Sequence, residues 1–143
     1  MQRGQSVWVA EVPETRYATT SGGDQVAFQV IGDGPVDVLI GRPPMFPVDL
    51  MWDEPRLAHF LNRLSSFSRH IWFDARGTGA SERIGGTESR LAETVVEDMV
   101  TVVNEVGCER VVLLQLGGVA LTLLFAATHP ERTSALVGVN TTA

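Results

Sequence analysis

The segment DARGTGAS, residues 74–81, combines a carboxylate, a guanidinium and a hydroxyl in a glycine-rich loop that follows an apolar run. A carboxylate at the end of a strand is a candidate general acid or base, so Asp74 and Arg76 are candidate catalytic residues by type. The same side chains can also satisfy the exposed amides and carbonyls of tight glycine turns, and we favour this structural interpretation. The loop does not form a dinucleotide fingerprint, because Glu82 stands where the third glycine is needed.

Three histidines and one cysteine are the other side chains with catalytic or metal-binding chemistry. His59 lies on a predicted helix, His70 begins a predicted strand, and His129 belongs to the helix-ending sequence HPER. Since none of them lies on a loop at a strand end, we expect structural or solvated roles for all three. The single cysteine, Cys108, excludes an internal disulfide, and we predict that it is a small buried residue.

Apolar runs alternate with helical patterns, which is typical of an α/β fold built on a mostly parallel sheet. Strands are predicted at 16–20, 25–31, 36–40, 70–74, 111–115 and 134–140. The first two flank a Ser-Gly-Gly-Asp turn and are predicted to form a hairpin. Helices are predicted from Pro55 onward, over 91–106, and between the Gly117-Gly118 turn and His129. The predicted order is therefore β-β-β-α-β-α-β-α-β.

Capping residues and apolar spacing locate the helices. Asp53, which precedes Pro55, is the predicted N-cap of the first helix. Its predicted core stripe is Leu57, Phe60, Leu61, Leu64 and Phe67. The second helix is predicted to bury Leu91, Val95, Met99, Val102 and Val106 and to end at Gly107. Its predicted solvent face is marked by Glu93, Glu97 and Asp98.

Composition and charge limit the classes of function. The chain has 143 residues, 44% of them hydrophobic, which suits a single globular domain. A net charge of −6 without a basic run argues against nucleic acid or an anionic membrane as the main partner. The N-terminus lacks the apolar core of a signal peptide, so we expect a cytoplasmic protein, and no metal or cofactor is predicted. We divide the chain into an N-terminal extension, residues 1–14, and a domain, residues 15–143.

Ligands of open α/β sheets bind beyond the carboxyl ends of the strands. Three predicted loops, 41–47, 74–81 and 115–119, reach that edge. The candidate pocket residues in or beside these loops are Met45, Phe46, Trp52, Asp74, Arg76 and Gln115. Trp72, within a strand, is predicted to lie in the core instead.

Several motifs together resemble the α/β-hydrolase family. They are the loop at 74–81, the block from Asp98 to GCERV at 107–111, and AATHPER at 126–132. The resemblance covers residues 15–143 and implies the N-terminal half of an α/β-hydrolase-like sheet, with six strands and three helices. The sequences of two further segments most resemble hydrolase domains that precede class III nucleotide cyclase domains, although this chain contains no cyclase segment. These segments are WDEPRL at 52–57 and LSSFSR at 64–69.

The resemblance also implies where a catalytic site would be. The family's nucleophile, on a G-x-S-x-G turn, falls on Leu116 when it is counted back from Arg132, and a leucine can neither attack a carbonyl nor be activated by a base. One oxyanion donor falls on Pro44, which has no N–H, so the N–H of Gly117 is the remaining donor. The family's acid and histidine follow later strands than this chain contains.

These observations predict a catalytically degenerate α/β-hydrolase-like module with a ligand-sensing, regulatory or protein-interaction role. The alternative is an ester or acyl hydrolase that is completed by a missing segment or a partner chain. This alternative is supported by the family resemblance alone. We do not expect this chain alone to be an enzyme. Because the last strand would leave an unpaired edge, we expect either a homodimer through residues 133–142 or a partner that completes the sheet.

Overall fold

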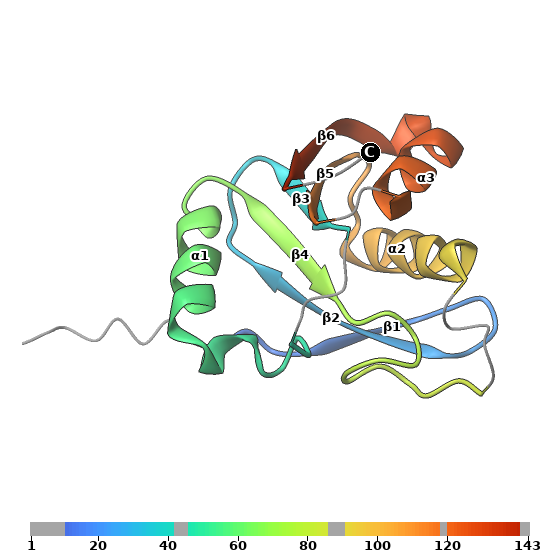
Figure 1. Cartoon of the computed structure of the whole chain (residues 1–143), viewed down its shortest axis with the longest axis horizontal. Helices are drawn as coiled ribbons and strands as arrows, with labels where there is room; N and C mark the ends of the chain where they lie inside the picture. The colour runs from blue at the N-terminus through green and yellow to red at the C-terminus, as the bar shows by residue number, and fades with distance from the viewer. Residues whose placement is uncertain (1–10, 42–45, 86–90, 118–119, 141–143) are drawn as a thin grey trace, which may run out of the picture.

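The computed structural model describes residues 11–41, 46–85, 91–117 and 120–140, and these form one sheet with helices on both faces (Figure 1). The strands are β1 (Arg16–Thr19), β2 (Gln25–Ile31), β3 (Asp37–Ile40), β4 (Arg69–Phe73), β5 (Val111–Leu116) and β6 (Thr133–Val139). Their order across the sheet is β1-β2-β4-β3-β5-β6. β1, β2 and β4 pair antiparallel, whereas β4, β3, β5 and β6 pair parallel. The predicted fold class and element order are confirmed.

The three α-helices lie on opposite faces of this sheet (Figure 1). α1 (Pro55–Ser65) lies on one face and follows the short 3-10 helix η1 (Met51–Asp53). α2 (Ala92–Val106) and α3 (Ala120–Thr128) pack together on the other face, and η3 (Pro130–Arg132) leads into β6. The face that carries α1 is called the α1 face below.

A cluster of buried apolar side chains lies on each face of the sheet. On the α1 face, Leu61 and Leu64 pack in one cluster with Trp72 of β4. On the other face, Met99 of α2 packs in one cluster with Leu113 of β5. Burying side chains of this size contributes about 1.5–3 kcal/mol each, so these two layers hold the helices on the sheet. The prediction that Trp72 belongs to the core is confirmed.

The first helix differs from its predicted start. Its N-cap is Glu54 rather than Asp53, and the Glu54 carboxylate accepts a hydrogen bond from the Leu57 N–H at 2.7 Å. Asp53 is exposed and ends η1 instead. The reason is local, because Pro55 occupies the first helical position and the residue before it is therefore the one placed to cap.

The predicted core stripes are also too wide. Phe60 and Phe67 are exposed, while only Leu61 and Leu64 of α1 are buried. Leu91 is the exposed N-cap of α2 rather than a core residue. A helix that rests on one face of a sheet buries only the stripe that meets the sheet, and apolar residues beside that stripe stay in solvent unless another element covers them.

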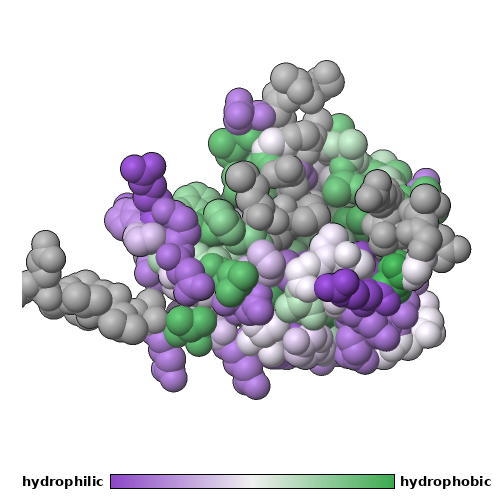
Figure 2. All heavy atoms as spheres, turned by 60° about the horizontal axis from the view of Figure 1, so that its bottom comes forward, coloured by the Kyte–Doolittle hydropathy of each residue, from purple (hydrophilic) through white to green (hydrophobic). Residues whose placement is uncertain are grey.

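Apolar side chains also reach the surface near the end of the chain. Figure 2 shows hydrophilic residues over most of the lower part of one face and hydrophobic residues exposed in its upper part. Leu123 of α3 and Val137 and Val139 of β6 are among the exposed large hydrophobic residues. Within the described ranges, no helix combines the length and the apolar character needed to cross a bilayer.

The capping assignment predicts a difference between two neighbouring acids. Replacing Glu54 with Ala should lower the free energy of unfolding by about 1 kcal/mol, because the Leu57 N–H loses its acceptor. Asp53→Ala is the matched control and should change it by less than about 0.5 kcal/mol. Urea unfolding measures both. A larger loss for Asp53→Ala than for Glu54→Ala would show that the cap is misassigned.

Candidate functional site

The carboxyl ends of β3 and β5 meet where the connections of the sheet diverge. Along the chain, β3 is followed by β4, which pairs with β3 on one side. β4 is followed by β5, which pairs with β3 on the other side. Such a switch point is where open α/β sheets bind ligands. Gly41 follows β3 and donates its N–H to the Leu114 carbonyl at 3.0 Å, which holds the two strand ends together. The predicted positions Pro44, Met45 and Gly118 lie outside the described residues.

Leu116 and Gly117, at the end of β5, have no nucleophilic side chain. Leu116 is the last residue of β5, is half-buried and pairs with Val139 of β6. The left-handed backbone conformation falls one residue later, at Gly117, with φ of 77°. The Gly117 N–H donates to the Val139 carbonyl at 3.0 Å. The N–H group that the resemblance implied as an oxyanion donor is therefore used by the sheet.

Gln115, near the end of β5, has a buried side-chain amide whose oxygen is unpaired. The side chain is 1% exposed, and its Oε1 is the only buried side-chain nitrogen or oxygen in the described part of the chain without a hydrogen-bond partner. The amide lies against Gly41, where an added Cβ would be 2.9 Å from Oε1. An unpaired buried acceptor costs about 1–3 kcal/mol, so a hydrogen bond to Oε1 would remove an unfavourable contribution to the folded state.

Asp74 organises the loop that follows β4. Its carboxylate accepts hydrogen bonds from the Ala80 N–H at 2.8 Å and from the Val48 N–H at 3.2 Å. Gly79 has a φ of 51°, and any side chain there would collide with the Asp74 carboxylate. Burial raises the pKa of Asp74 above its ordinary value, and the two N–H groups oppose that shift. These contacts favour the structural interpretation of Asp74, because its oxygens hold backbone rather than facing a substrate.

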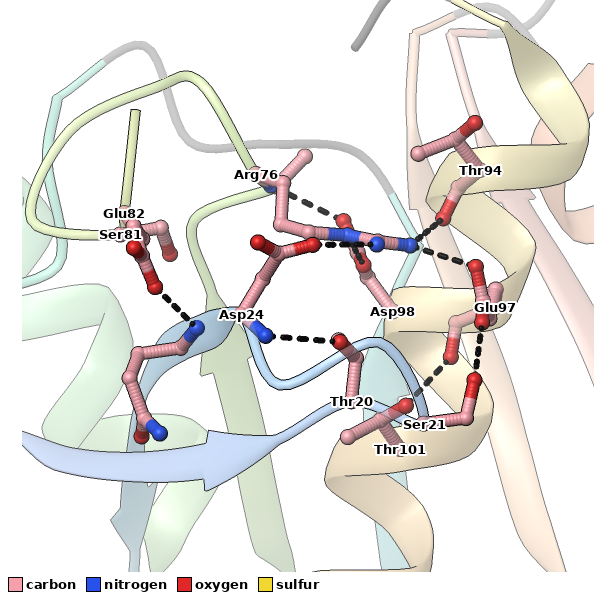
Figure 3. Close-up of polar contacts among 12 residues, drawn as sticks. Thr20, Ser21, Asp24, Arg76, Ser81, Glu82, Thr94, Glu97, Asp98 and Thr101 are labelled. Atoms are coloured by element: carbon pink, nitrogen blue, oxygen red, sulfur yellow. Dashed lines mark hydrogen bonds and ion pairs between the residues drawn. The ribbon is translucent and has the colours of Figure 1, made fainter. Parts of the chain in front are cut away.

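Arg76 links three segments through one guanidinium (Figure 3). Its Nε donates to Asp98 of α2 at 2.6 Å, and its Nη2 donates to Glu97 at 2.6 Å. Its Nη1 donates at 3.1 Å to Asp24, in the turn between β1 and β2. The backbone N–H of Arg76 donates to the second oxygen of Asp98 at 2.9 Å. The side chain is therefore engaged with α2 and the turn, although the sequence made it a pocket candidate.

The charges of this cluster explain its titration behaviour. Burial by itself would lower the pKa of Arg76, but the hydrogen bonds to Glu97 and Asp24 and the charge of Asp98 outweigh burial and raise it. The hydrogen bond from Arg76 lowers the pKa of Glu97, against a smaller opposing effect of burial. The guanidinium therefore remains charged, and one cation faces three carboxylates.

The prediction that Asp98 faces solvent is wrong, because its side chain is 0% exposed. Val95 and Val102 are buried three residues before and four residues after it, which places Asp98 on the core face of α2. An acid at core spacing needs a cation, and Arg76 provides it. The helical spacing of Asp98 from Val95 and Val102 was the feature of the sequence that could have predicted its burial. Glu97, at 46% side-chain exposure, lies at the rim of the same cluster.

The aromatic pocket candidates at this edge have distinct positions. Phe46 is exposed. Trp52 is half-buried and donates its Nε1–H to Gln29 of β2 at 3.0 Å. Of the candidates within the described residues, Asp74, Arg76 and Trp52 have their polar groups bonded within the protein, and Gln115 retains the unpaired acceptor.

The predicted structural roles of His70 and Cys108 agree with their burial. His70 accepts a hydrogen bond from the Trp72 Nε1–H at 2.8 Å, and its Nε2 lies 3.1 Å from the Leu61 carbonyl. These two contacts select the neutral ring with the proton on Nε2. Burial lowers the pKa of His70 to about 4. Burial raises the pKa of Cys108 to about 11, so its thiol stays protonated.

The described residues contain no group of three or more His, Cys, Asp or Glu side chains arranged to hold a metal ion.

Comparison with known proteins gives matches in structure. No protein-family model matches the chain, and no curated protein matches it in sequence. A hydrolase from Pseudomonas aeruginosa matches with a TM-score of 0.75 and 25% identity, over 91% of this chain and 47% of that chain. An epoxide hydrolase from Vigna radiata matches with a TM-score of 0.71 and 25% identity, over 90% of this chain and 40% of that chain. An epoxide hydrolase variant from Bacillus megaterium matches with a TM-score of 0.70 and 23% identity, over 88% and 42%.

These matches and the topology define the class of fold. The chain forms part of an α/β-hydrolase fold, with a six-stranded, mostly parallel sheet and three α-helices. It spans less than half the length of each of these three solved structures. The activities of those longer proteins are therefore matters of proposal for this chain.

The buried ion pair predicts that Asp98 contributes more than Glu97 to the free energy of unfolding. Asp98→Ala should lower the free energy of unfolding by about 3–5 kcal/mol, because it leaves the buried Arg76 without its enclosed partner. Glu97→Ala is the matched control and should cost less than about 1 kcal/mol, since solvent screens that pair. Urea unfolding distinguishes them. Equal losses would mean that burial of Asp98 does not determine the strength of the cluster.

The neutral state of His70 predicts a loss of stability in mild acid. The unfolded chain binds a proton at this residue below about pH 6.5, whereas the folded chain resists protonation until about pH 4. Stability is therefore fully present above pH 6.5 and should fall by up to about 3 kcal/mol as the pH approaches 4. His70→Gln should lack this part of the pH dependence, and His59→Gln, on the exposed side of α1, should keep it. Urea midpoints from pH 7 to pH 4 that are parallel for all three proteins would contradict the assignment.

Proposed function

We propose that this chain is a non-catalytic α/β-hydrolase-like module that acts by binding, as a regulatory or protein-interaction unit. One observation carries the proposal, namely the end of β5. Leu116 stands at the position that the resemblance gives to the nucleophile, and the Gly117 N–H is bonded to Val139. A hydrolase of this fold needs a nucleophile and an oxyanion donor at that point.

The switch point between β3 and β5 supports a ligand-sensing form of the proposal. Gln115 keeps an unpaired, buried acceptor there, and Phe46, on the loop that follows β3, is exposed. A small molecule with an N–H or O–H donor and an apolar body has the matching chemistry. Binding of this kind requires no group at Leu116.

The resemblance of residues 52–57 and 64–69 to hydrolase domains ahead of nucleotide cyclase domains supports a regulatory role, and the comparisons give no link to a cyclase. We place the module in the cytoplasm. The exposed position of β6 at the sheet edge supports partner binding, through a second copy or through another chain that completes the sheet.

The alternative function is an ester or acyl hydrolase that a further segment or partner completes. The structural matches to epoxide hydrolases and to a hydrolase favour it. It requires a nucleophile that residues 114–117, Leu-Gln-Leu-Gly, do not contain.

The proposal predicts that restoring a hydroxyl will not restore catalysis. Leu116→Ser should give no hydrolysis of p-nitrophenyl acetate above the Leu116→Ala control, because no base activates the serine and loss of an oxyanion donor alone costs about 10²–10³ in rate. Intact mass after treatment with a fluorophosphonate should show no adduct on the native chain. Ester turnover that the reagent abolishes, with the label mapped to this chain, would overturn the proposal.

A further inference from the structure

A groove lies between α2 and α3, which pack together on the face of the sheet opposite α1 (Figure 1). Its α2 wall consists of Glu93, Val96, Glu97 and Val100, whose spacing places them on one stripe of the helix. Its volume is about 320 Å³, at the lower end of the range for small-molecule pockets. A hollow of this size suits a small molecule rather than the row of anchors with which a helix docks. It is called the α2–α3 groove below.

The floor of the α2–α3 groove is apolar and is held in place by the core. Val96 is buried and belongs to the cluster that contains Met99 and Leu113. Val100 of α2 and Leu124 of α3 also line the groove, are half-buried and pack against the same cluster. Because these side chains are already fixed by packing, a ligand that lies on them has little of the protein to order. The floor is therefore a preformed surface for an apolar ligand body.

The α2 rim of the groove carries two carboxylates. Glu97 is engaged with other groups, because its two oxygens accept hydrogen bonds from Arg76 at 2.6 Å and from Ser21 at 3.0 Å (Figure 3). Glu93 is exposed, and it has no ion-pair partner among the described residues. The described residues that line the groove include no Lys or Arg. Glu93 is therefore the charged group of the rim that is available to a cation.

The α3 rim also presents hydrogen-bond acceptors. It consists of Thr128, at the end of α3, and His129. The Thr128 hydroxyl donates to the Leu124 carbonyl at 2.7 Å, so its oxygen accepts the hydrogen bond from His129 Nδ1 at 2.9 Å. This contact assigns the ring proton to Nδ1 and leaves Nε2 as an acceptor. The ring stacks on Phe125 with a centroid distance of 5.2 Å, which fixes its position.

We propose that the α2–α3 groove binds a small organic cation, namely a primary ammonium group on an aromatic or alkyl body. An ammonium group has three donors and no acceptor, which matches a negatively charged rim of acceptors. The body of the ligand lies on the apolar floor. A net charge of −6 attracts cations to the chain as a whole. This site goes beyond the proposed function, because none of its lining residues belongs to the switch point between β3 and β5.

The test uses tryptamine as the probe and indole-3-propionate as its matched anion, because the two molecules share a ring and a linker and differ in charge. Isothermal titration calorimetry of the full chain should show one tryptamine site. Indole-3-propionate should bind at least about tenfold more weakly, since its carboxylate would face Glu93 and Glu97. Amide NMR shifts induced by tryptamine should be concentrated at residues 93–100 and 124–129.

Two variants separate a contact with Glu93 from general attraction by the charge of the chain. Glu93→Gln should weaken tryptamine binding about threefold, because the ammonium group loses a solvent-exposed ionic contact. Glu105→Gln is the matched control, since it removes the same charge from an exposed position of α2 outside the groove. It should change the affinity by less than about 1.5-fold, because solvent and salt screen a distant charge. Circular dichroism establishes that both variants remain folded.

The absence of saturable tryptamine binding, or equal affinity for the two indole compounds, would overturn the inference. Equal effects of the two glutamine substitutions would also overturn it, because the attraction would then come from the overall charge. NMR shifts at Gly41 and Gln115 in place of the groove residues would assign the ligand to the switch point and overturn it as well. None of these results contradicts the proposed function, which fails separately if the chain hydrolyses an ester and a fluorophosphonate label maps to it.

Discussion

The buried ion pair between Arg76 and Asp98 is the contact on which the arrangement of several segments depends. Asp98 is enclosed in the core face of α2, where an isolated carboxylate would be strongly unfavourable, and Arg76 supplies both a side-chain and a backbone donor. The same guanidinium reaches Asp24 in the turn between β1 and β2. The loop after β4, the hairpin turn and α2 are consequently positioned by one cation. Since α2 connects β4 to β5 across β3, this contact also helps to fix the strand order around the switch point between β3 and β5.

The position of a ligand site in this fold and the groups found there have separate origins. The switch point between β3 and β5 follows from topology and from the hydrogen bond of Gly41 to Leu114. The groups needed for acyl transfer are a separate matter, because they depend on individual side chains and on free N–H groups. At the end of β5 the side chain is leucine, and the Gly117 N–H extends the pairing with β6. Gln115 Oε1 is left as a buried acceptor without a hydrogen-bond partner.

The two edges of the sheet differ in length and in the exposure of their side chains. β1, at one edge, is short and antiparallel, whereas β6, at the other, has seven residues, with apolar side chains on its exposed face. Phe60 and Phe67 of α1 are exposed as well. Helices normally cover both faces of a mostly parallel sheet, because both faces are apolar. Within the described part of the chain, these apolar side chains remain largely in solvent.

The class of fold could be predicted from the sequence, because the alternation of apolar runs and helical patterns depends on neighbouring residues. The sequence also predicted the hairpin at the Ser-Gly-Gly-Asp turn, the glycine-rich loop after β4 and the absence of a nucleophile from residues 114–117. Three features became visible in the folded chain: Asp98 is buried against Arg76, Phe60 and Phe67 are exposed, and the Gly117 N–H is bonded to Val139. Periodicity shows which residues share a face of a helix or strand. What lies opposite that face, and which donor each buried acceptor meets, is set by segments distant in the sequence.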